Sequence, residues 1–229
     1  QDAKTVLWGD SYAMHLAPAL VASDTKADFI QITKSSCGPF PGLSIDLGKT
    51  RWEQCTKFND DALNWISNAE GISTVIMSSA FLQVLNPTYT RDGAVIDSDE
   101  VSNRMVQNIL DTQRYLRDHG KSILIVSPPP QNGRSLGRCF VRHRVVGRPP
   151  DECNFNQDEM TERNIEITKI LKQVEKDVPV IWIDDFICDE KVCQTAMNQI
   201  SIYRDSGHLS VQGSAALGER SGDVRTVPP

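Results

Sequence analysis

The chain has 229 residues, of which 39% are hydrophobic and 24% charged, a composition typical of a soluble globular protein. Its formal net charge of −6 argues against a global attraction to nucleic acid or anionic lipid, and no stretch approaches the roughly 18 apolar residues of a membrane span. We therefore expect a single domain over residues 1–229 with no nucleic-acid partner. Because the chain begins at Gln1 rather than Met, we expect it to be a piece of a longer protein.

Five short apolar runs, each rich in valine and isoleucine, predict buried strands. They are Thr5–Trp8, Phe29–Thr33, Thr74–Met77, Ser122–Val126 and Val178–Ile183. Apolar residues at helical spacing lie between and after these runs, and they predict helices at Tyr12–Ser23, Trp52–Asn68, Asp99–Asp118, Gln157–Lys176 and Val211–Arg220. Pro18 is expected to bend the first of these helices.

The alternation of strand and helix predicts a parallel sheet covered on both faces by helices. We expect a three-layer α/β/α sandwich whose sheet has about five strands in a flavodoxin-like order. Ligands bind at the carboxyl ends of the strands in such sheets, so the residues after Trp8 are candidates for a site. Two stretches rich in glycine and proline, Ser35–Lys49 and Pro128–Pro150, are predicted to be loops.

The cysteines fall into three local couples, and an even count in couples favours disulfides formed in an oxidising compartment. The couples are Cys37 with Cys55, Cys139 with Cys153, and Cys188 with Cys193. Local pairing is the simplest connectivity, although sequence alone does not choose among connectivities. The alternative is a set of buried free thiols in a cytosolic enzyme. Since no C-x-x-C motif is present and the histidines are scattered, we expect no metal site.

Ser11 follows the first predicted strand in the sequence Gly9-Asp10-Ser11. A glycine at this point permits a tight turn, which exposes a serine hydroxyl where a helix begins and where backbone N–H groups can stabilise an oxyanion. A serine hydroxyl is a weak nucleophile unless a base lies nearby. The alternative interpretation is that Ser11 only caps the helix.

A base is available near the other end of the chain, where Asp205 and His208 lie three residues apart before the last predicted helix. This spacing lets the carboxylate reach one imidazole nitrogen while the other faces a nucleophile, so that the aspartate fixes the tautomer and stabilises the imidazolium. The alternative is that both residues serve only the turn and the helix cap.

Together, Gly9-Asp10-Ser11 after the first strand and Asp205-Ser206-Gly207-His208 before the last helix resemble the first and last blocks of the SGNH (GDSL-like) hydrolase family. The resemblance spans nearly the whole chain because its two blocks lie at opposite ends. It implies a flavodoxin-like fold, a Ser11–His208–Asp205 catalytic triad, acyl transfer through an acyl-serine, and no cofactor.

A narrower resemblance is to the SGNH domains fused to membrane acyltransferase-3 proteins, which O-acetylate bacterial surface polysaccharides. It is carried by the Leu-Trp-Gly-Asp-Ser-Tyr opening, by Ser35-Ser36-Cys37-Gly38-Pro39, and by the stretch from Asp205 to Gly213. It implies a periplasmic domain of an inner-membrane protein. The resemblance also implies that the membrane domain supplies the acetyl donor.

One block departs from the family pattern. SGNH enzymes typically have Gly-x-Asn-Asp after the third strand, where the asparagine donates to the oxyanion, but here Ser78-Ser79-Ala80-Phe81 follows. We therefore expect the oxyanion hole to use the backbone N–H groups of Ser11 and Gly38, with a contribution from Ser79.

Two further features involve basic residues. Several basic residues lie in the second predicted loop, where they could bind an anionic glycan or phosphates near a membrane. More often such a cluster is simply a solvated part of the surface. These residues are Arg134, Arg138, Arg142, His143, Arg144 and Arg148. His15 lies one helical turn after Ser11 and is predicted to be a packing or surface residue.

The sequence thus predicts a serine-dependent O-acetyltransferase that acts on a bacterial carbohydrate. One alternative is a carbohydrate acetylesterase with the same triad and water as the acceptor. Another is a catalytically silent glycan-binding module, which the missing Gly-x-Asn-Asp block favours.

Overall fold

The computed structural model describes residues 3–23, 28–47 and 51–221. The chain divides by its internal contacts into two compact units. The sheet unit comprises Gln1–Met14, Asp28–Ser127 and Ile165–Ile181, and the second unit comprises His15–Ala27, Pro128–Asn164 and Trp182–Pro229. The expectation of a single domain over the whole chain stays a prediction.

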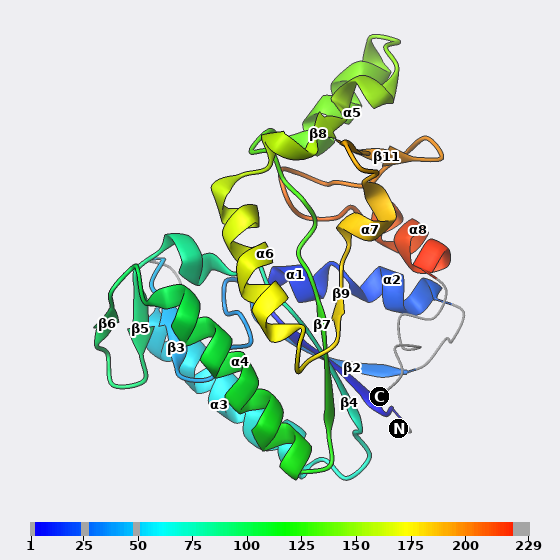
Figure 1. The fold of residues 1–229 in the computed structure, drawn as a ribbon. Coiled ribbons are helices and arrows are strands. Elements are labelled where there is room, and N and C mark those ends of the chain that lie inside the picture. Colours follow the sequence, from blue (N-terminus) through cyan, green and yellow to red (C-terminus); the bar gives the residue numbers. More distant parts are fainter. Residues whose placement is uncertain (1–2, 24–27, 48–50, 222–229) are drawn as a thin grey trace. The chain divides into compact units, whose positions relative to one another are not determined.

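The sheet unit is built on a five-stranded parallel sheet in the order β2-β1-β4-β7-β9, the predicted flavodoxin-like order (Figure 1). The strands are β1 (Thr5–Gly9), β2 (Phe29–Thr33), β4 (Thr74–Ser78), β7 (Ser122–Val126) and β9 (Val180–Ile181). Every residue of β1 is buried, which explains why this strand is a continuous apolar run rather than an alternating one. Gly9 pairs with Thr33 on one side and with Ser78 on the other, so three strands end at the same level.

The last strand is shorter than the predicted Val178–Ile183. The Val178 N–H donates to the carbonyl of Val174 and so belongs to the end of a helix, whereas the Asp185 N–H already closes a turn on Trp182. Only Val180 and Ile181 therefore remain to pair with β7.

Helices flank the sheet, as predicted. In the sheet unit they include α1 (Ser11–Met14), α3 (Trp52–Asn68) and α4 (Val101–Asp118), and α6 (Glu162–Val174) lies mostly in this unit. Helix α4 packs on β7 through a buried stripe that includes Met105, Ile109 and Leu116, as its helical spacing requires. A short 3₁₀ helix, η1 (Leu82–Leu85), follows β4.

The predicted loop Ser35–Lys49 is partly wrong, because it contains a strand, β3 (Leu43–Ile45). This strand pairs with β5 (Thr88–Thr90), which pairs in turn with β6 (Val95–Ile96) in a small antiparallel sheet. A strand of three residues is too short to show an alternating pattern of apolar and polar residues in the sequence, and the partner of β3 lies far along the chain. The last two residues of the predicted loop, 48 and 49, lie outside the described residues.

The predicted helix Tyr12–Ser23 is also wrong in its continuity. It is divided into α1 and α2 (Ala17–Ala22), and Pro18 lies in the first turn of α2 rather than within a longer helix. Proline suits that position because its missing N–H would have no helical acceptor there.

In the second unit, α2 packs against α8 (Val211–Ser221). Gly218 permits this contact, since a Cβ at that position would lie 2.2 Å from the carbonyl oxygen of Ala19. The rest of the unit consists of short elements: α5 (Leu136–Val145), η2 (Pro150–Cys153), β8 (Phe155–Asn156), η3 (Gln157–Glu159), α7 (Asp184–Ile187), β10 (Val192–Cys193), β11 (Ala196–Met197) and β12 (Ile200–Ser201). Helix α5 contradicts the prediction of an unbroken loop over Pro128–Pro150.

All three local cysteine couples are disulfides, which confirms the predicted pairs. Their Cα atoms are 5.2 Å apart in Cys37–Cys55, 5.9 Å in Cys139–Cys153 and 3.9 Å in Cys188–Cys193. His143 lies near the Cys139–Cys153 bridge. The sulfurs of these two cysteines are bonded to each other, so they are not thiolates that could bind a metal ion beside His143. Among the described residues, no helix is both long and apolar enough to cross a bilayer.

Gly9 gives a first prediction. A Cβ at this position would lie 2.0 Å from the backbone oxygen of Ser78, and φ is +155°. Gly9→Ala should therefore lower the free energy of unfolding by about 3 kcal/mol, because two paired strands must move apart. Urea denaturation measures this change. Gly71→Ala is the matched control, since its Cβ meets only one atom, at 3.9 Å, and an equal loss in both variants would contradict the argument.

Candidate active site

The first group of candidate residues lies where β1 ends and α1 begins. Ser11 is the first residue of α1, and its side chain is partly exposed. The turn is possible because Gly9 has no side chain to collide with Ser78 on the neighbouring strand. The sequence thus places a serine hydroxyl at the carboxyl end of a central parallel strand, the location predicted for a site.

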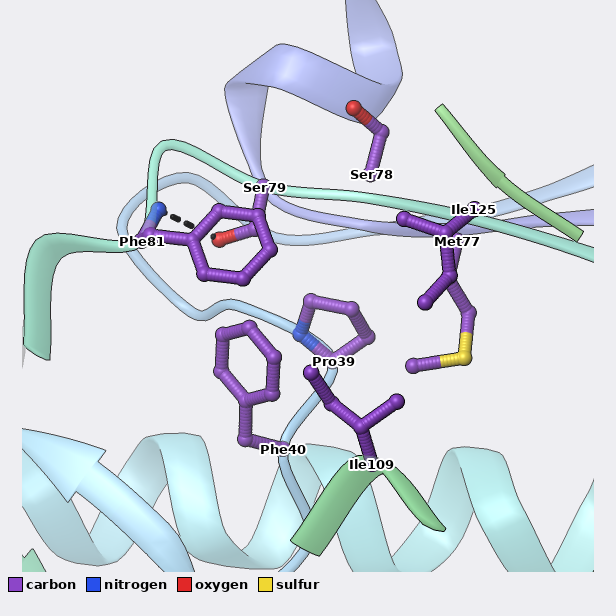
Figure 2. Close-up of a pocket in the computed structure, with 8 residues that line it drawn as sticks. All are labelled: Pro39, Phe40, Met77, Ser78, Ser79, Phe81, Ile109 and Ile125. Carbon is purple, nitrogen blue, oxygen red and sulfur yellow. Dashed lines mark hydrogen bonds between the residues drawn. The ribbon is translucent and has the colours of Figure 1, made fainter. Parts of the chain in front are cut away.

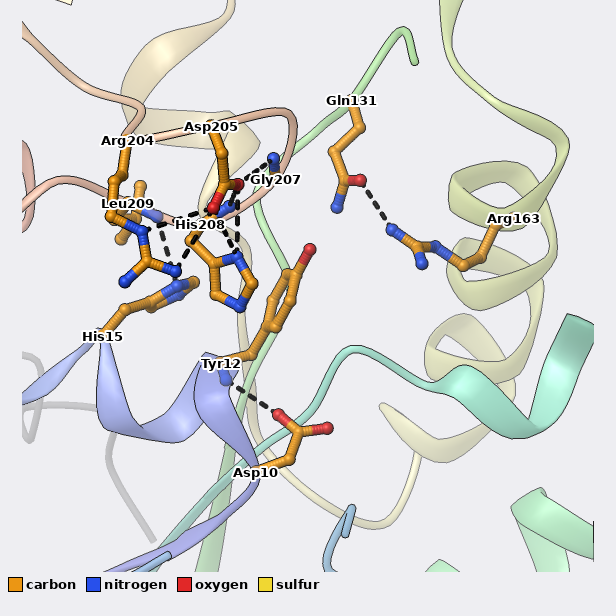
Figure 3. Close-up of polar contacts among 10 residues, drawn as sticks. All are labelled: Asp10, Tyr12, His15, Gln131, Arg163, Arg204, Asp205, Gly207, His208 and Leu209. Atoms are coloured by element: carbon orange, nitrogen blue, oxygen red, sulfur yellow. Dashed lines mark hydrogen bonds and ion pairs between the residues drawn. The ribbon is translucent and has the colours of Figure 1, made fainter. Parts of the chain in front are cut away.

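Asp10 holds this turn in place. Its side chain is 1% exposed, and Oδ1 accepts the Tyr12 N–H at 2.8 Å (Figure 3). Oδ2 accepts the Ser79 hydroxyl at 2.8 Å and the Ala80 N–H at 3.0 Å. A buried carboxylate is tolerated only when such donors satisfy it, so Asp10 ties the turn after β1 to the segment after β4.

Ser79 and Gly38, the predicted oxyanion residues, lie together. A Cβ on Gly38 would lie 2.6 Å from the Ser79 Oγ and 2.6 Å from the Phe40 ring, so only glycine fits. The Gly38 carbonyl accepts the Asn59 side-chain N–H at 2.7 Å, whereas no acceptor for the Gly38 N–H occurs in the described part of the chain. That N–H therefore remains available for a ligand oxygen.

The Ser79 hydroxyl has a structural role that the sequence did not reveal. Its single proton goes to Asp10, and its oxygen accepts the Phe81 N–H at 3.0 Å. Any oxyanion contact from Ser79 would therefore have to come from its backbone N–H. The sequence signal for this contact was Asp10, an ionisable residue directly after a wholly buried strand, but its partner Ser79 is 69 residues away.

Beneath this segment lies a small recess lined by apolar side chains and by Ser78 and Ser79 (Figure 2). Phe40 and Phe81 form part of its wall, with ring centroids 5.3 Å apart. Its volume of about 10 Å³ holds at most one water molecule, so it is packing space rather than an acyl pocket.

The second group is the turn containing Asp205 and His208, in the second unit. The His208 Nδ1 lies 3.0 Å from Oδ2 and 3.1 Å from Oδ1 of Asp205 (Figure 3). Asp205 Oδ1 also accepts the N–H groups of Gly207 at 3.0 Å and His208 at 2.8 Å, which gives the turn its shape. Since a carboxylate only accepts, Nδ1 carries the imidazole proton and Nε2 presents a lone pair.

Asp205 is firmly ionised. Burial alone would raise its pKa, but the backbone N–H groups of Gly207 and His208, the His208 ring and the Arg204 guanidinium outweigh it and lower the pKa to about 2. Arg204 Nη2 lies 3.2 Å from Oδ2, so the carboxylate is shared between Arg204 and His208. Arg204 was not among the predicted site residues, and its only signal in the sequence is that it is adjacent to Asp205.

His15 supports the same turn from below. Its Nδ1 accepts the Leu209 N–H at 3.2 Å, and its ring meets the His208 ring edge-to-face at a centroid distance of 5.9 Å. Burial, followed by repulsion from His208 and Arg204, lowers the pKa of His15 to about 3. His15 is therefore neutral at ordinary pH and positions the backbone next to His208.

The structure thus brings Asp205 to His208 and Gly38 to Ser79. Ser11 belongs to the sheet unit, whereas Asp205 and His208 belong to the second unit. The meeting of Ser11 with His208 stays a prediction.

This fold and these two motifs define a domain of the SGNH hydrolase type. A family model described as "SGNH domain (fused to AT3 domains)" matches residues 1–221, and the chain belongs to that family. No curated protein matches the chain in sequence.

Solved structures share the fold. The Salmonella ser. Paratyphi A lipopolysaccharide acetyltransferase periplasmic domain has a TM-score of 0.70 and 18% identity, over 94% of this chain and 80% of that one. A GDSL-like lipase from Bacteroides thetaiotaomicron has a TM-score of 0.51 and 10% identity, over 96% of this chain and 87% of that one. At these identities the likeness shows the fold alone.

The Asp10 contacts lead to a second prediction. Asp10→Asn replaces an acceptor oxygen with an NH₂ group that faces a backbone N–H or a hydroxyl donor. We expect the free energy of unfolding to fall by about 2–3 kcal/mol in urea denaturation. Exposed Asp158→Asn is the control, with no change expected. Unchanged stability in Asp10→Asn would show that the carboxylate is not required.

The role of His15 gives a third prediction. His15→Leu removes the acceptor of the Leu209 N–H, and the free energy of unfolding should fall by about 1–2 kcal/mol. Amide hydrogen exchange at Leu209 should become faster. In His15→Asn, the Oδ1 atom can take the place of Nδ1, so exchange at Leu209 should be slower than in His15→Leu. Equal exchange rates in both variants would contradict the positioning role.

Proposed function

We propose that the chain is the periplasmic SGNH domain of a membrane acyltransferase and that it transfers an acetyl group to a carbohydrate hydroxyl. Membership of the family fused to AT3 domains supports this proposal, as does a fold shared with a lipopolysaccharide acetyltransferase periplasmic domain. The Asp205–His208 pair is the observation that carries it, because a general base requires a fixed tautomer whose Nε2 carries no proton.

In this proposal Ser11 is the nucleophile. His208 Nε2 takes the Ser11 hydroxyl proton while Oγ attacks the acetyl carbonyl carbon. The tetrahedral intermediate then collapses, the bond to the donor oxygen breaks, and that oxygen takes the proton from His208. Asp205 stays ionised throughout and stabilises the imidazolium, as its low pKa favours.

The second half-reaction regenerates Ser11. A sugar hydroxyl gives its proton to His208 and attacks the acetyl-serine carbonyl, and collapse releases the acetylated sugar as Ser11 recovers its proton. The backbone N–H groups of Ser11 and Gly38 would stabilise the oxyanion in both halves. The available N–H of Gly38 favours that assignment.

A membrane partner domain would supply the acetyl donor, and the site itself would need neither metal nor cofactor. The three disulfides fit an oxidising compartment such as the periplasm. We also propose that residues 1–229 act as one domain of a longer protein.

Hydrolysis of p-nitrophenyl acetate provides the fourth prediction. Ser11→Ala and His208→Ala should each lower kcat/KM by about 10³-fold or more, and Asp205→Asn by a smaller factor of roughly 10² or more. Exposed Ser135→Ala and His119→Ala are matched controls and should retain wild-type rates. Circular dichroism of every variant shows whether the fold is intact.

Two outcomes would contradict the proposal. Full activity in Ser11→Ala would exclude an acyl-serine, and no turnover by the folded wild type would favour a silent glycan-binding module. The acceptor is tested by adding acetyl-free bacterial polysaccharide. Acetylated glycan in place of acetate supports transfer, whereas undiminished acetate release would make the chain an esterase.

A further inference from the structure

The stretch from His119 to Pro150 contains no aspartate or glutamate, although the chain as a whole has a net charge of −6. The same stretch contains six lysines and arginines: Lys121, Arg134, Arg138, Arg142, Arg144 and Arg148. Five of the six lie within or beside α5. The acidic chain therefore carries one locally cationic segment.

Helix α5 combines this charge with exposed apolar side chains. Arg138, Val141, Arg142 and Val145 follow the spacing i, i+3, i+4, i+7, which places them on one face of the helix. Val141 is 60% exposed and Val145 is 79% exposed, and both arginines are exposed. We call these four residues the outer face of α5.

The arginines of the outer face lack acidic partners among the described residues. Arg148 instead pairs with Glu152, and Arg134 pairs with Glu159 at 3.4 Å. Arg138 and Arg142 border a shallow surface hollow of about 480 Å³, which is also lined by Ser135, Cys139, His143, Val146 and Arg148. An anionic group of phosphate size would find several cations there and no carboxylate in its lining.

The helix is fixed rather than loosely attached. Cys139 is bonded to Cys153, and the Gly137 N–H donates to the Asp205 carbonyl at 3.1 Å. A Cβ at Gly137 would lie 2.2 Å from the Arg204 carbonyl oxygen, so α5 begins in close contact with the Asp205–His208 turn.

We propose that the outer face of α5 docks on an anionic phospholipid surface. The arginines bind lipid phosphates, and the valines enter the interface between headgroups and acyl chains. An anionic polysaccharide would account for Arg138 and Arg142 but not for the exposed Val141 and Val145 on the same face. This proposal goes beyond acetyl transfer and does not depend on the Ser11–His208 pair.

Vesicle flotation with the 229-residue chain tests the proposal and gives the fifth prediction. The chain should float with vesicles of phosphatidylglycerol and phosphatidylcholine in equal parts, but not with phosphatidylcholine alone. Arg138→Gln/Arg142→Gln should weaken the partition about 30-fold, since each arginine near an anionic surface contributes roughly five- to sixfold. Val141→Ser/Val145→Ser should weaken it roughly tenfold.

The control Arg104→Gln/Arg117→Gln removes the same charge from α4 and should bind like wild type. Thermal unfolding verifies that each variant is folded. Wild-type flotation of the arginine variant would overturn the proposal, as would equal weakening by the α4 control. Wild-type flotation of the valine variant would also overturn it, because a purely electrostatic surface needs no valines. Retention on immobilised polygalacturonate without any vesicle binding would assign the face to anionic polysaccharide instead.

Discussion

The buried carboxylate of Asp10 is the constraint on which the first half of the site depends. Its oxygens accept donors from both sides, the Tyr12 N–H after Ser11 and the Ser79 and Ala80 donors after β4. Because a carboxyl group with 1% exposure must keep these donors, the two strand ends are held together. The Ser79 hydroxyl that Asp10 holds is also the atom that Gly38 approaches most closely, together with the Phe40 ring.

Asp205 has a different task in a different environment. Its side chain is 40% exposed, yet donors from its own turn and from Arg204 keep it ionised. Asp10 therefore holds a turn in place through the donors around its buried side chain. Asp205 instead orients the His208 imidazole and keeps a negative charge next to that ring. The neutral His15 completes the second half, because it accepts the Leu209 N–H without adding a positive charge beside His208.

Much of this could be predicted from sequence, because buried strands and long amphipathic helices have strong periodic signals. The strands Phe29–Thr33 and Ser122–Val126 and the helix Trp52–Asn68 have the predicted bounds. Helix α5 was missed because its surroundings are rich in proline and glycine, and because a disulfide and one narrow buried face hold it in place. The Asp10–Ser79 bond joins residues far apart in sequence, and no local pattern encodes it.

The same bond bears on the missing asparagine. In SGNH enzymes with the Gly-x-Asn-Asp block, the asparagine after the third strand donates a hydrogen bond to the oxyanion. In this chain the Ser79 hydroxyl, in the corresponding segment, donates to Asp10 instead. Loss of one such donor costs about 10²–10³ in rate, which is a severe handicap for a hydrolase that meets its ester in dilute solution. A domain tethered to its acetyl donor starts from a high effective concentration, which offsets a loss of that size. The bracing role of Ser79 thus fits the proposed transferase better than a free-standing esterase.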